Sequence, residues 1–172
     1  MIIDLPRLRL RAFKPADGEP VVAALNDWAV AQWLIAPPHP YGQGDFEQYD
    51  DIVRRDHAGE FPTHFAIARR ASDELVGCMA VVVKPDGVGE LGYWLARASW
   101  RQGLAGEAAK AVIAAARRHP GIRRLVATTD PENEASRRLL AKVGFTLISQ
   151  TTRDQPTRRG TTEVCLYEYA LA

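Results

Sequence analysis

The chain has 172 residues, of which 25% are charged and 47% hydrophobic, and its formal net charge is +1. This length predicts a single domain, residues 1–172, with a core of its own. A nearly neutral chain is not a general nucleic-acid binder, because phosphate backbones require a basic face. The sequence has no apolar run of membrane-spanning length and no signal-peptide pattern, so we expect a soluble cytoplasmic protein with no membrane partner.

The first half of the chain predicts a strand, then helical segments, then three strands. Leucine alternates with charge at the start, as in a half-buried strand. Proline and glycine mark a loop at 36–44. The predicted elements are a strand at 5–11, helices at 14–26, 27–35 and 45–57, and strands at 63–70, 75–84 and 88–96.

The second half predicts a helix, a strand, a second helix and two closing strands. An apolar stripe with helical spacing runs through 103–119, and Pro120 and Gly121 end it. A strand at 122–128 follows, and the next helix begins near Asp130 or Asn133, with Gly144 as its C-cap. Strands at 145–149 and 163–171 flank a polar, arginine-rich connection. This order predicts an α/β (α+β) mixed sheet with helices on its faces.

The most informative stretch is the junction between the strand at 88–96 and the helix at 103–119. The first N–H groups of a helix have no partner within the helix and point along the positive end of its dipole. Gly103 has no Cβ, so a phosphate can approach the backbone closely there. The junction therefore predicts a diphosphate site. A nucleotide-binding protein is a poor alternative, since both the dinucleotide fingerprint and the P-loop pattern are absent.

The run W-R-Q-G-L-A-G-E-A resembles the coenzyme A loop of the GNAT superfamily of N-acetyltransferases, Q/R-x-x-G-x-G/A. Trp100, Gly103 and Ala105 occupy its first, fourth and sixth places. Tryptophan at the first place is similar to the Rim-type ribosomal-protein N-terminal acetyltransferases, although Arg101 stands where that branch usually has glycine and Gly106 where it often has threonine. The segments 133–145, N-x-x-S-x-x-x-L-x-x-x-G-F, and 6–13 match the same branch, so the resemblance covers nearly the whole chain.

The resemblance implies the GNAT acyl-CoA N-acyltransferase fold, with about seven strands and helices on both faces. In that fold the fourth and fifth strands splay apart, and the pantetheine arm of acetyl-CoA pairs with the fourth. The implied cosubstrate is acetyl-CoA, with no metal. The residues expected to bind it are Trp94, Leu95, Ala96, Arg101, Gln102, Gly103, Leu104, Ala105, Gly106 and Asn133.

The resemblance also suggests catalytic residues. Glu90 is the candidate base, acting through water or by positioning the amine, or else it is a surface glutamate at a strand start. Ser136 is expected to face the coenzyme A sulfur, and Asn133 either takes part in catalysis or caps its helix. Many GNAT enzymes place a tyrosine where this chain has Leu140. The oxyanion donor is expected to be a backbone N–H at a bulge near Leu95.

Several other side chains have two possible interpretations each. Trp28, Trp33 and Phe46 belong to the helical core or line the acceptor cleft. Trp100 packs at the loop corner or lies beside the cosubstrate, and Arg97 and Arg101 bind phosphate or are solvated. The four histidines have no metal-ligand spacing, with His39 a loop residue or substrate contact and His64 a weak alternative base. Cys78 and Cys165 are expected to be buried, reduced thiols.

The predicted activity is acetyl transfer to a primary amine by direct attack in a ternary complex, since no cysteine has a neighbouring base. The acceptor is a small molecule or a peptide N-terminus. At pH 7, deprotonating an α-amino group costs about 1.4 kcal/mol and a lysine side chain about 4.6 kcal/mol. The alternative is a non-catalytic acyl-CoA-binding regulatory module. The last strand lies within the sheet or pairs with a second chain, which would make a homodimer.

Overall fold

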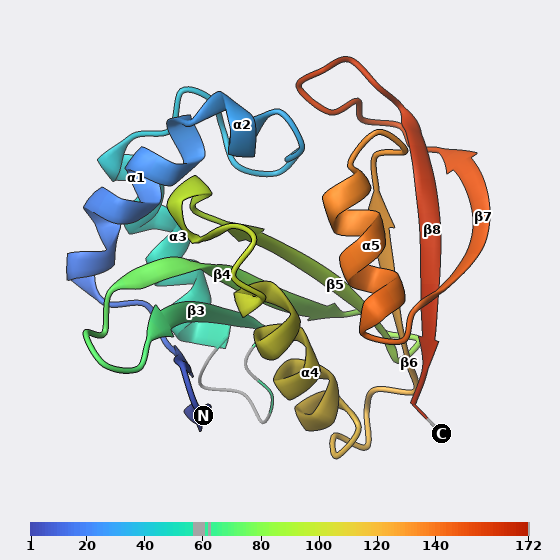
Figure 1. Ribbon diagram of the computed structural model, residues 1–172, viewed down its shortest axis with the longest axis horizontal. Coiled ribbons are helices and arrows are strands. Elements are labelled where there is room, and N and C mark those ends of the chain that lie inside the picture. Colours follow the sequence, from blue (N-terminus) through green and yellow to red (C-terminus); the bar gives the residue numbers. More distant parts are fainter. Residues whose placement is uncertain (57–60, 62, 172) are drawn as a thin grey trace.

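The computed structural model describes residues 1–56, 61 and 63–171. Within these residues, eight strands form one mixed sheet in the order β1-β2-β3-β4-β5-β6-β8-β7 (Figure 1). Among these eight described strands, only β5 and β6 are parallel neighbours. The strands are β1 (Ile3–Asp4), β2 (Leu8–Arg11), β3 (His64–Arg69), β4 (Leu75–Val83), β5 (Val88–Leu95), β6 (Arg124–Thr129), β7 (Thr146–Thr152) and β8 (Glu163–Ala170). The expected mixed sheet is confirmed, with the two-residue β1 as an extra edge strand, and β8 lies inside the sheet.

Five α-helices complete the described fold: α1 (Gly18–Asn26), α2 (Trp28–Ala31), α3 (Gln43–Asp56), α4 (Leu104–Ala116) and α5 (Glu134–Lys142). Short 3-10 turns precede α1 and α4, at Pro15–Asp17 and Arg97–Ser99. The helix expected at 27–35 is only one turn long. Within the described residues, no helix is long and apolar enough to cross a membrane.

Helices cover both faces of the sheet, as expected (Figure 1). Strand alternation sends Phe65 and Ile67 of β3 to the face under α4 and α5, and Ala66 between them to the face under α1 and α3. The apolar stripe of α4 is buried in the first of these two cores. Phe46 of α3 lies in the second, as predicted, whereas Trp28 is 51% exposed because Val30 and Ala31 occupy the buried side of the short α2.

The sheet opens between β5 and β6. Their register runs only from Val88 with Arg124 to Glu90 with Val126, so the later residues of β5 and β6 do not pair with each other. This is the expected splay, and it falls between the fifth and sixth strands because β1 adds one to the count. Beyond Glu90, the edge of β5 is therefore free to pair with a ligand.

The bulge expected near Leu95 is not there. The register between β4 and β5 is continuous from Gly77 with Leu95 to Val83 with Gly89. The irregularity lies one strand away, where Ile67 and Ala68 of β3 face Gly77 and Leu75 and leave Val76 as an extra residue of β4. Glycine is required next to this bulge, because a Cβ at Gly77 would lie 2.3 Å from the Trp94 carbonyl oxygen.

A buried ion pair ties the start of the chain to the sheet. Arg11 of β2 is 3% exposed and donates to both carboxylate oxygens of Asp17, at 2.7 and 3.0 Å. Its Nε also donates to Asp73 in the turn between β3 and β4, at 2.8 Å. The fork geometry of the guanidinium satisfies both carboxylates, so this buried charge is compensated.

Candidate active site

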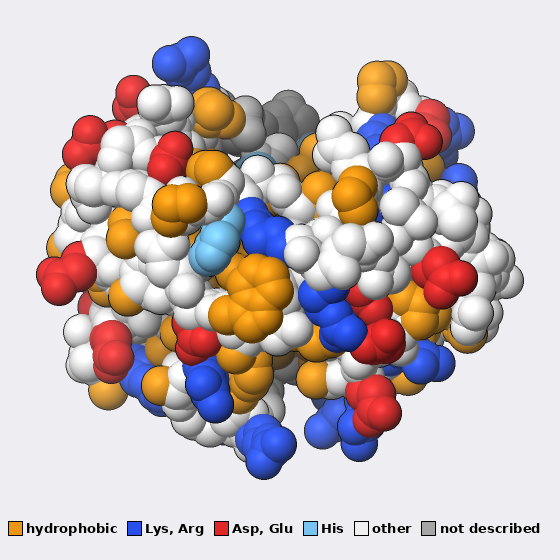
Figure 2. All heavy atoms as spheres, turned by 90° about the horizontal axis from the view of Figure 1, so that it is seen from above, with side chains coloured by type: hydrophobic (Ala, Val, Ile, Leu, Met, Phe, Trp, Pro, Cys, Tyr) orange, Lys and Arg blue, Asp and Glu red, His pale blue; other side chains and the backbone are white. Residues whose placement is uncertain are grey.

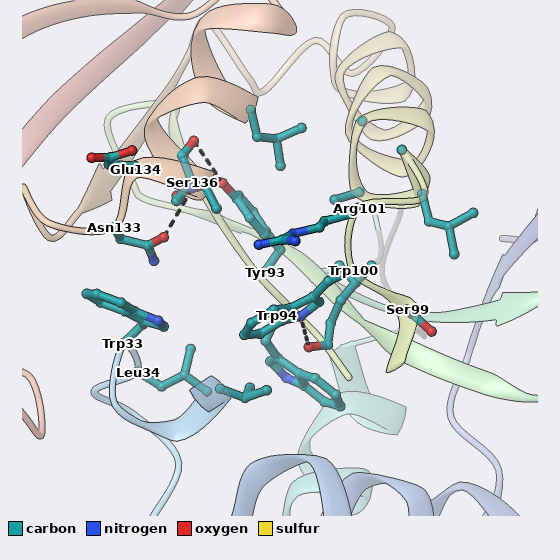
Figure 3. Close-up of a pocket in the computed structure, with 18 of the residues that line it drawn as sticks. Trp33, Leu34, Tyr93, Trp94, Ser99, Trp100, Arg101, Asn133, Glu134 and Ser136 are labelled. Atoms are coloured by element: carbon teal, nitrogen blue, oxygen red, sulfur yellow. Dashed lines mark hydrogen bonds between the residues drawn. The ribbon is translucent and has the colours of Figure 1, made fainter. Parts of the chain in front are cut away.

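A cleft of about 560 Å³ opens between the N-terminal ends of α4 and α5, on the face of the sheet that these helices cover. We call it the first cleft. Its lining includes most of the residues expected to bind the cosubstrate: Trp94, Leu95, Arg101, Gly103, Leu104, Ala105, Gly106 and Asn133. Ser99, Trp100 and Ser136 also line it. In Figure 3 the side chains of Tyr93, Trp100, Arg101, Asn133 and Ser136 lie around one space, which they reach from β5, from the loop before α4 and from the start of α5.

The N-terminus of α4 presents uncapped backbone amides to the first cleft. Gly103 is the N-cap residue, with a left-handed φ of 75°, and no side chain caps the helix. Arg101 also has a positive φ, 59°, and lines the cleft. Gly106 lines the cleft beside α5, and a Cβ at this position would be in ordinary van der Waals contact with Leu139, at 3.5 Å. Free N–H groups, a helix dipole and a cation make this end of the cleft suited to an anion such as a diphosphate.

The free edge of β5 carries a backbone amide into the splay. Ala96 N–H donates to the Val76 carbonyl on β4, at 2.9 Å. Because backbone groups alternate along a strand, the N–H and carbonyl of Leu95 face away from β4. The Trp100 indole N–H donates to the Leu95 carbonyl at 2.8 Å. Trp100 thus packs against this edge at the loop corner and also, at 39% exposure, forms part of the cleft wall.

A second cleft, of about 630 Å³, lies on the other face of the sheet, under α1 and α3. Glu90 and Gly92 of β5, Thr128 of β6 and Asp130 after it are among its lining residues, as are Tyr41 and Tyr49. Figure 2 looks onto the end of the molecule near α2, where hydrophobic, histidine and basic side chains meet over the middle of the surface. Several residues line both clefts: Trp33, Leu34, Tyr93, Trp94, Asn133 and Ser136.

The two clefts meet at a pair of hydroxyl groups. The Tyr93 Oη lies 2.7 Å from the Ser136 Oγ, and the two side chains point toward each other in Figure 3. Burial raises the pKa of Tyr93 to about 12, although the bond to Ser136 opposes the shift, so the phenol stays protonated at neutral pH. The Tyr93 hydroxyl was missed from the sequence. Period-two alternation was the available signal, since it puts Tyr93 on the same face of β5 as Leu91 and Leu95.

Glu90 lines the second cleft but not the first. Its Oε2 lies 3.0 Å from the Lys84 Nζ, and the two side chains are 39% and 51% exposed. The carboxylate is thus an ion-paired, water-accessible group at the point where β5 leaves β6. It is separated along the strand from the hydroxyl pair, so any role it has in proton transfer runs through water.

Asn133 caps α5, and its side-chain Oδ1 accepts from the Ser136 N–H at 3.1 Å. The prediction that Asn133 caps its helix is confirmed, and the same side chain lines both clefts. Leu140 is 1% exposed and packs in the core, so it offers no hydroxyl at the position where many family members have tyrosine. The structure instead brings a phenol to Ser136 from β5.

Other predicted residues lie elsewhere. Ala96 and Gln102 are not among the residues lining the first cleft. The Gln102 side chain donates to the Ala98 carbonyl at 2.9 Å and accepts from Arg69, the last residue of β3, at 3.2 Å. Arg97 is exposed and lines neither cleft.

The histidines and cysteines have varied surroundings. His64 lines the second cleft with its Nδ1 2.8 Å from the Thr63 Oγ1, whereas His39 is exposed beside Trp28. His57 lies outside the described residues. Cys78 and Cys165 are free and buried, as predicted, and burial raises the pKa of Cys78 to about 12. Among the described residues, no group of three or more His, Cys, Asp or Glu side chains is arranged to hold a metal ion.

The loop at 153–162 between β7 and β8 closes one end of the site. Arg158 donates to the carbonyls of Ala31 and Leu34, at 2.8 and 3.0 Å, and also to that of Pro37. The neighbouring Arg159 guanidinium lies 4.6 Å from the centre of the Trp33 ring. These contacts hold the loop against the segment after α2, over the residues shared by the two clefts.

A family model described as an acetyltransferase (GNAT) domain matches residues 7–146 of the chain. The chain belongs to the GNAT acetyltransferase family. Its enzymatic class is accordingly N-acetyltransferase.

Relatives and solved structures agree with this assignment. The N-acetyltransferase YoaA of Bacillus subtilis is 27% identical over 152 residues, which cover 84% of this chain and 82% of YoaA. A GNAT-family acetyltransferase from Bacillus anthracis superposes with a TM-score of 0.83 at 22% identity, covering 99% of both chains. RimL, a ribosomal L7/L12 alpha-N-protein acetyltransferase solved with coenzyme A, gives 0.84 at 20% identity and covers 99% of this chain and 98% of RimL. The GNAT fold is thereby confirmed.

Proposed function

We propose that this GNAT enzyme moves the acetyl group of acetyl-CoA to a primary amine, by direct attack in a ternary complex. The observation that carries the proposal is the meeting of two clefts at Tyr93 and Ser136. One cleft takes acetyl-CoA and the other takes the amine, so the two substrates approach from opposite faces of the sheet. RimL, whose structure holds coenzyme A, supports the same cosubstrate here.

The residues of the first cleft fit acetyl-CoA in two places. The uncapped start of α4 and Arg101 suit the diphosphate, as free amides and a cation would. Beyond Glu90 the edge of β5 faces the splay, where an amide of the pantetheine arm is able to extend the ladder. The Leu95 N–H, which also faces away from β4, is our candidate donor to the developing oxyanion, now from a regular strand.

Acetyl-CoA supplies an activated thioester, and the side chains of the protein act on the atoms around it. The amine nitrogen forms a bond to the carbonyl carbon, the carbon–sulfur bond breaks, and sulfur leaves with the electron pair. The hydroxyls of Tyr93 and Ser136 hydrogen-bond the departing thiolate, which then takes a proton from solvent. The amine gives up one proton through water to Glu90, where Lys84 balances the charge of the carboxylate.

The first experiment is a thermal shift with acetyl-CoA, followed by an assay of thiol release with a panel of primary amines. A ligand at about 100 times its Kd adds about 2.7 kcal/mol of stability, visible as a rise of several degrees in Tm. Glu90→Gln and Ser136→Ala should keep this shift and lose turnover. A stabilised protein with no turnover on any amine would favour the binding module instead. Absence of a shift at saturating acetyl-CoA would contradict the proposal.

A further inference from the structure

Two of the charged groups that line the second cleft have partners that account for them. Asp45 accepts from the Gly42 N–H at 2.8 Å, and Glu90 pairs with Lys84. Two groups differ: Asp130, directly after β6, and Arg153, directly after β7. Each lines the cleft and each carries a buried polar atom that has no hydrogen-bond partner among the described residues, Asp130 Oδ2 and Arg153 Nε.

Asp130 is 2% exposed. Its Oδ1 accepts from the Glu132 N–H at 2.8 Å, and its backbone carbonyl accepts from the Asn133 N–H at 2.9 Å, so the turn into α5 holds the carboxylate in place. The second oxygen, Oδ2, is not used by this turn. A buried carboxylate oxygen without a partner costs a large part of its hydration energy, and a cationic or N–H-bearing ligand would recover it.

Arg153 is held by its backbone N–H, which donates to the Thr162 carbonyl at 2.9 Å. Burial lowers the pKa of its guanidinium, while the charges of Asp130 and Glu90 act in the opposite direction. Within the described structure Arg153 forms no ion pair with either carboxylate. The second cleft thus holds one positive group, Arg153, and one negative group, Asp130, that do not pair with each other.

We propose that Asp130 and Arg153 recognise a zwitterionic acceptor, a free amino acid whose amine binds the Asp130 carboxylate and whose carboxylate binds Arg153. This inference rests on the proposed acetyl transfer and names the acceptor of the same site. A carboxylate accepts hydrogen bonds from an ammonium group and from a neutral amine, so Asp130 holds the acceptor before and after it loses its proton.

The pairing also discriminates between amines. A polyamine or a lysine side chain has no carboxylate for Arg153 and would leave its half-buried guanidinium unpaired. An amino acid amide or a peptide N-terminus offers a carbonyl oxygen but no negative charge. Hydrogen bonds to charged groups are the stronger ones, so removing the carboxylate is expected to lower kcat/KM at least about 10-fold.

The test compares matched acceptors by thiol release. A mixture of amino acids with mass detection of the acetylated product identifies the preferred side chain. The chosen amino acid is then compared with its amide, its decarboxylated amine and a tripeptide beginning with the same residue. We expect the free amino acid to have the highest kcat/KM. Equal rates with the decarboxylated amine, or a preference for the tripeptide, would overturn the inference while leaving acetyl transfer in place.

Two variants tie the preference to the residues. Asp130→Asn keeps the Oδ1 acceptor of the turn and loses the charge, and Arg153→Met keeps an unbranched side chain. Each should raise the KM for the amino acid at least about 10-fold and leave the thermal shift with acetyl-CoA unchanged. Arg153→Met should also abolish the preference for the acid over its amide, which loss of folding alone would not do. Arg138→Met, which removes an exposed arginine of α5, is the control.

Calorimetry separates this inference from the proposed function. If no amine is acetylated but the amino acid binds wild type and fails to bind Asp130→Asn and Arg153→Met, the activity is wrong and the recognition site stands. If amines are acetylated and neither variant changes the acid-to-amide ratio, the activity stands and the recognition site is wrong. If neither binding nor turnover depends on the two residues, the inference is overturned.

Discussion

Tyr93 Oη on β5 and Ser136 Oγ on α5 lie 2.7 Å apart, although the two residues are 43 positions apart in the chain. Their bond crosses the opening where β5 and β6 separate. Both residues line both clefts, so a thioester in one cleft and an amine in the other would react beside these hydroxyls. This contact is the basis of the first two predictions.

Tyr93→Phe should lower kcat about 100-fold, because it removes one of the two donors to the departing thiolate and keeps the ring in place. The KM for acetyl-CoA should change little. Steady-state kinetics with saturating amine provide the measurement. Tyr169→Phe is a matched control, since the Tyr169 hydroxyl accepts from Arg117 and lines neither cleft. Equal kcat values for Tyr93→Phe and wild type would rule out a role for the phenol.

The pH dependence of the wild-type rate should show no loss of the Tyr93 donor up to pH 10. Burial raises the pKa of this phenol to about 12, so it remains protonated throughout that range. The measurement is kcat from pH 6 to 10 for wild type and Tyr93→Phe. A decrease in kcat between pH 8 and 10 that Tyr93→Phe abolishes would contradict this expectation.

Gly103→Ala should weaken acetyl-CoA binding and lower stability. The φ of 75° strains any residue with a Cβ, at a cost of about 1 kcal/mol. Space is not the obstacle, since the nearest atom to the new Cβ would be an Arg7 nitrogen at 3.6 Å. Gly160→Ala is the matched control, because Gly160 has a φ of 83° and open space around it. Both variants should lower Tm, but only Gly103→Ala should reduce the thermal shift with acetyl-CoA.

Asn133 has a structural role that one substitution preserves and another removes. Asn133→Ala should lower the free energy of unfolding by about 1 kcal/mol, because it deletes the cap on the Ser136 N–H. Asn133→Asp keeps the acceptor and places a negative charge at the helix N-terminus, so its stability should match wild type. It loses the amide donor that faces both clefts, and kcat/KM should fall about 10-fold. Urea unfolding and steady-state kinetics measure the two effects, and wild-type kcat/KM in Asn133→Asp would limit Asn133 to capping.

Sequence patterns predicted the elements whose causes are local. The apolar stripe of α4, the glycine at its start and the Asn133 cap each depend on residues a few positions apart, and all three are present. The resemblance in the loop before α4 also located most of the first cleft. The helix predicted at 27–35 was too long. Helix propensity in this segment does not show that the chain leaves the helix after one turn, at Ala31.

Only the tertiary structure decided which distant side chains share the site. The meeting of Tyr93 with Ser136 depends on the register of β5, the point at which β6 leaves it and the packing of α5 over the gap. The same holds for Asp130 and Arg153, which follow different strands and both line the second cleft. The sequence by itself determined most of the helices and strands and the glycine turn before α4, since hydrogen bonds and side-chain spacing within a few residues specify them. The proposed reacting centre required the sheet, because long-range strand order and splay, which no local pattern encodes, bring its groups together.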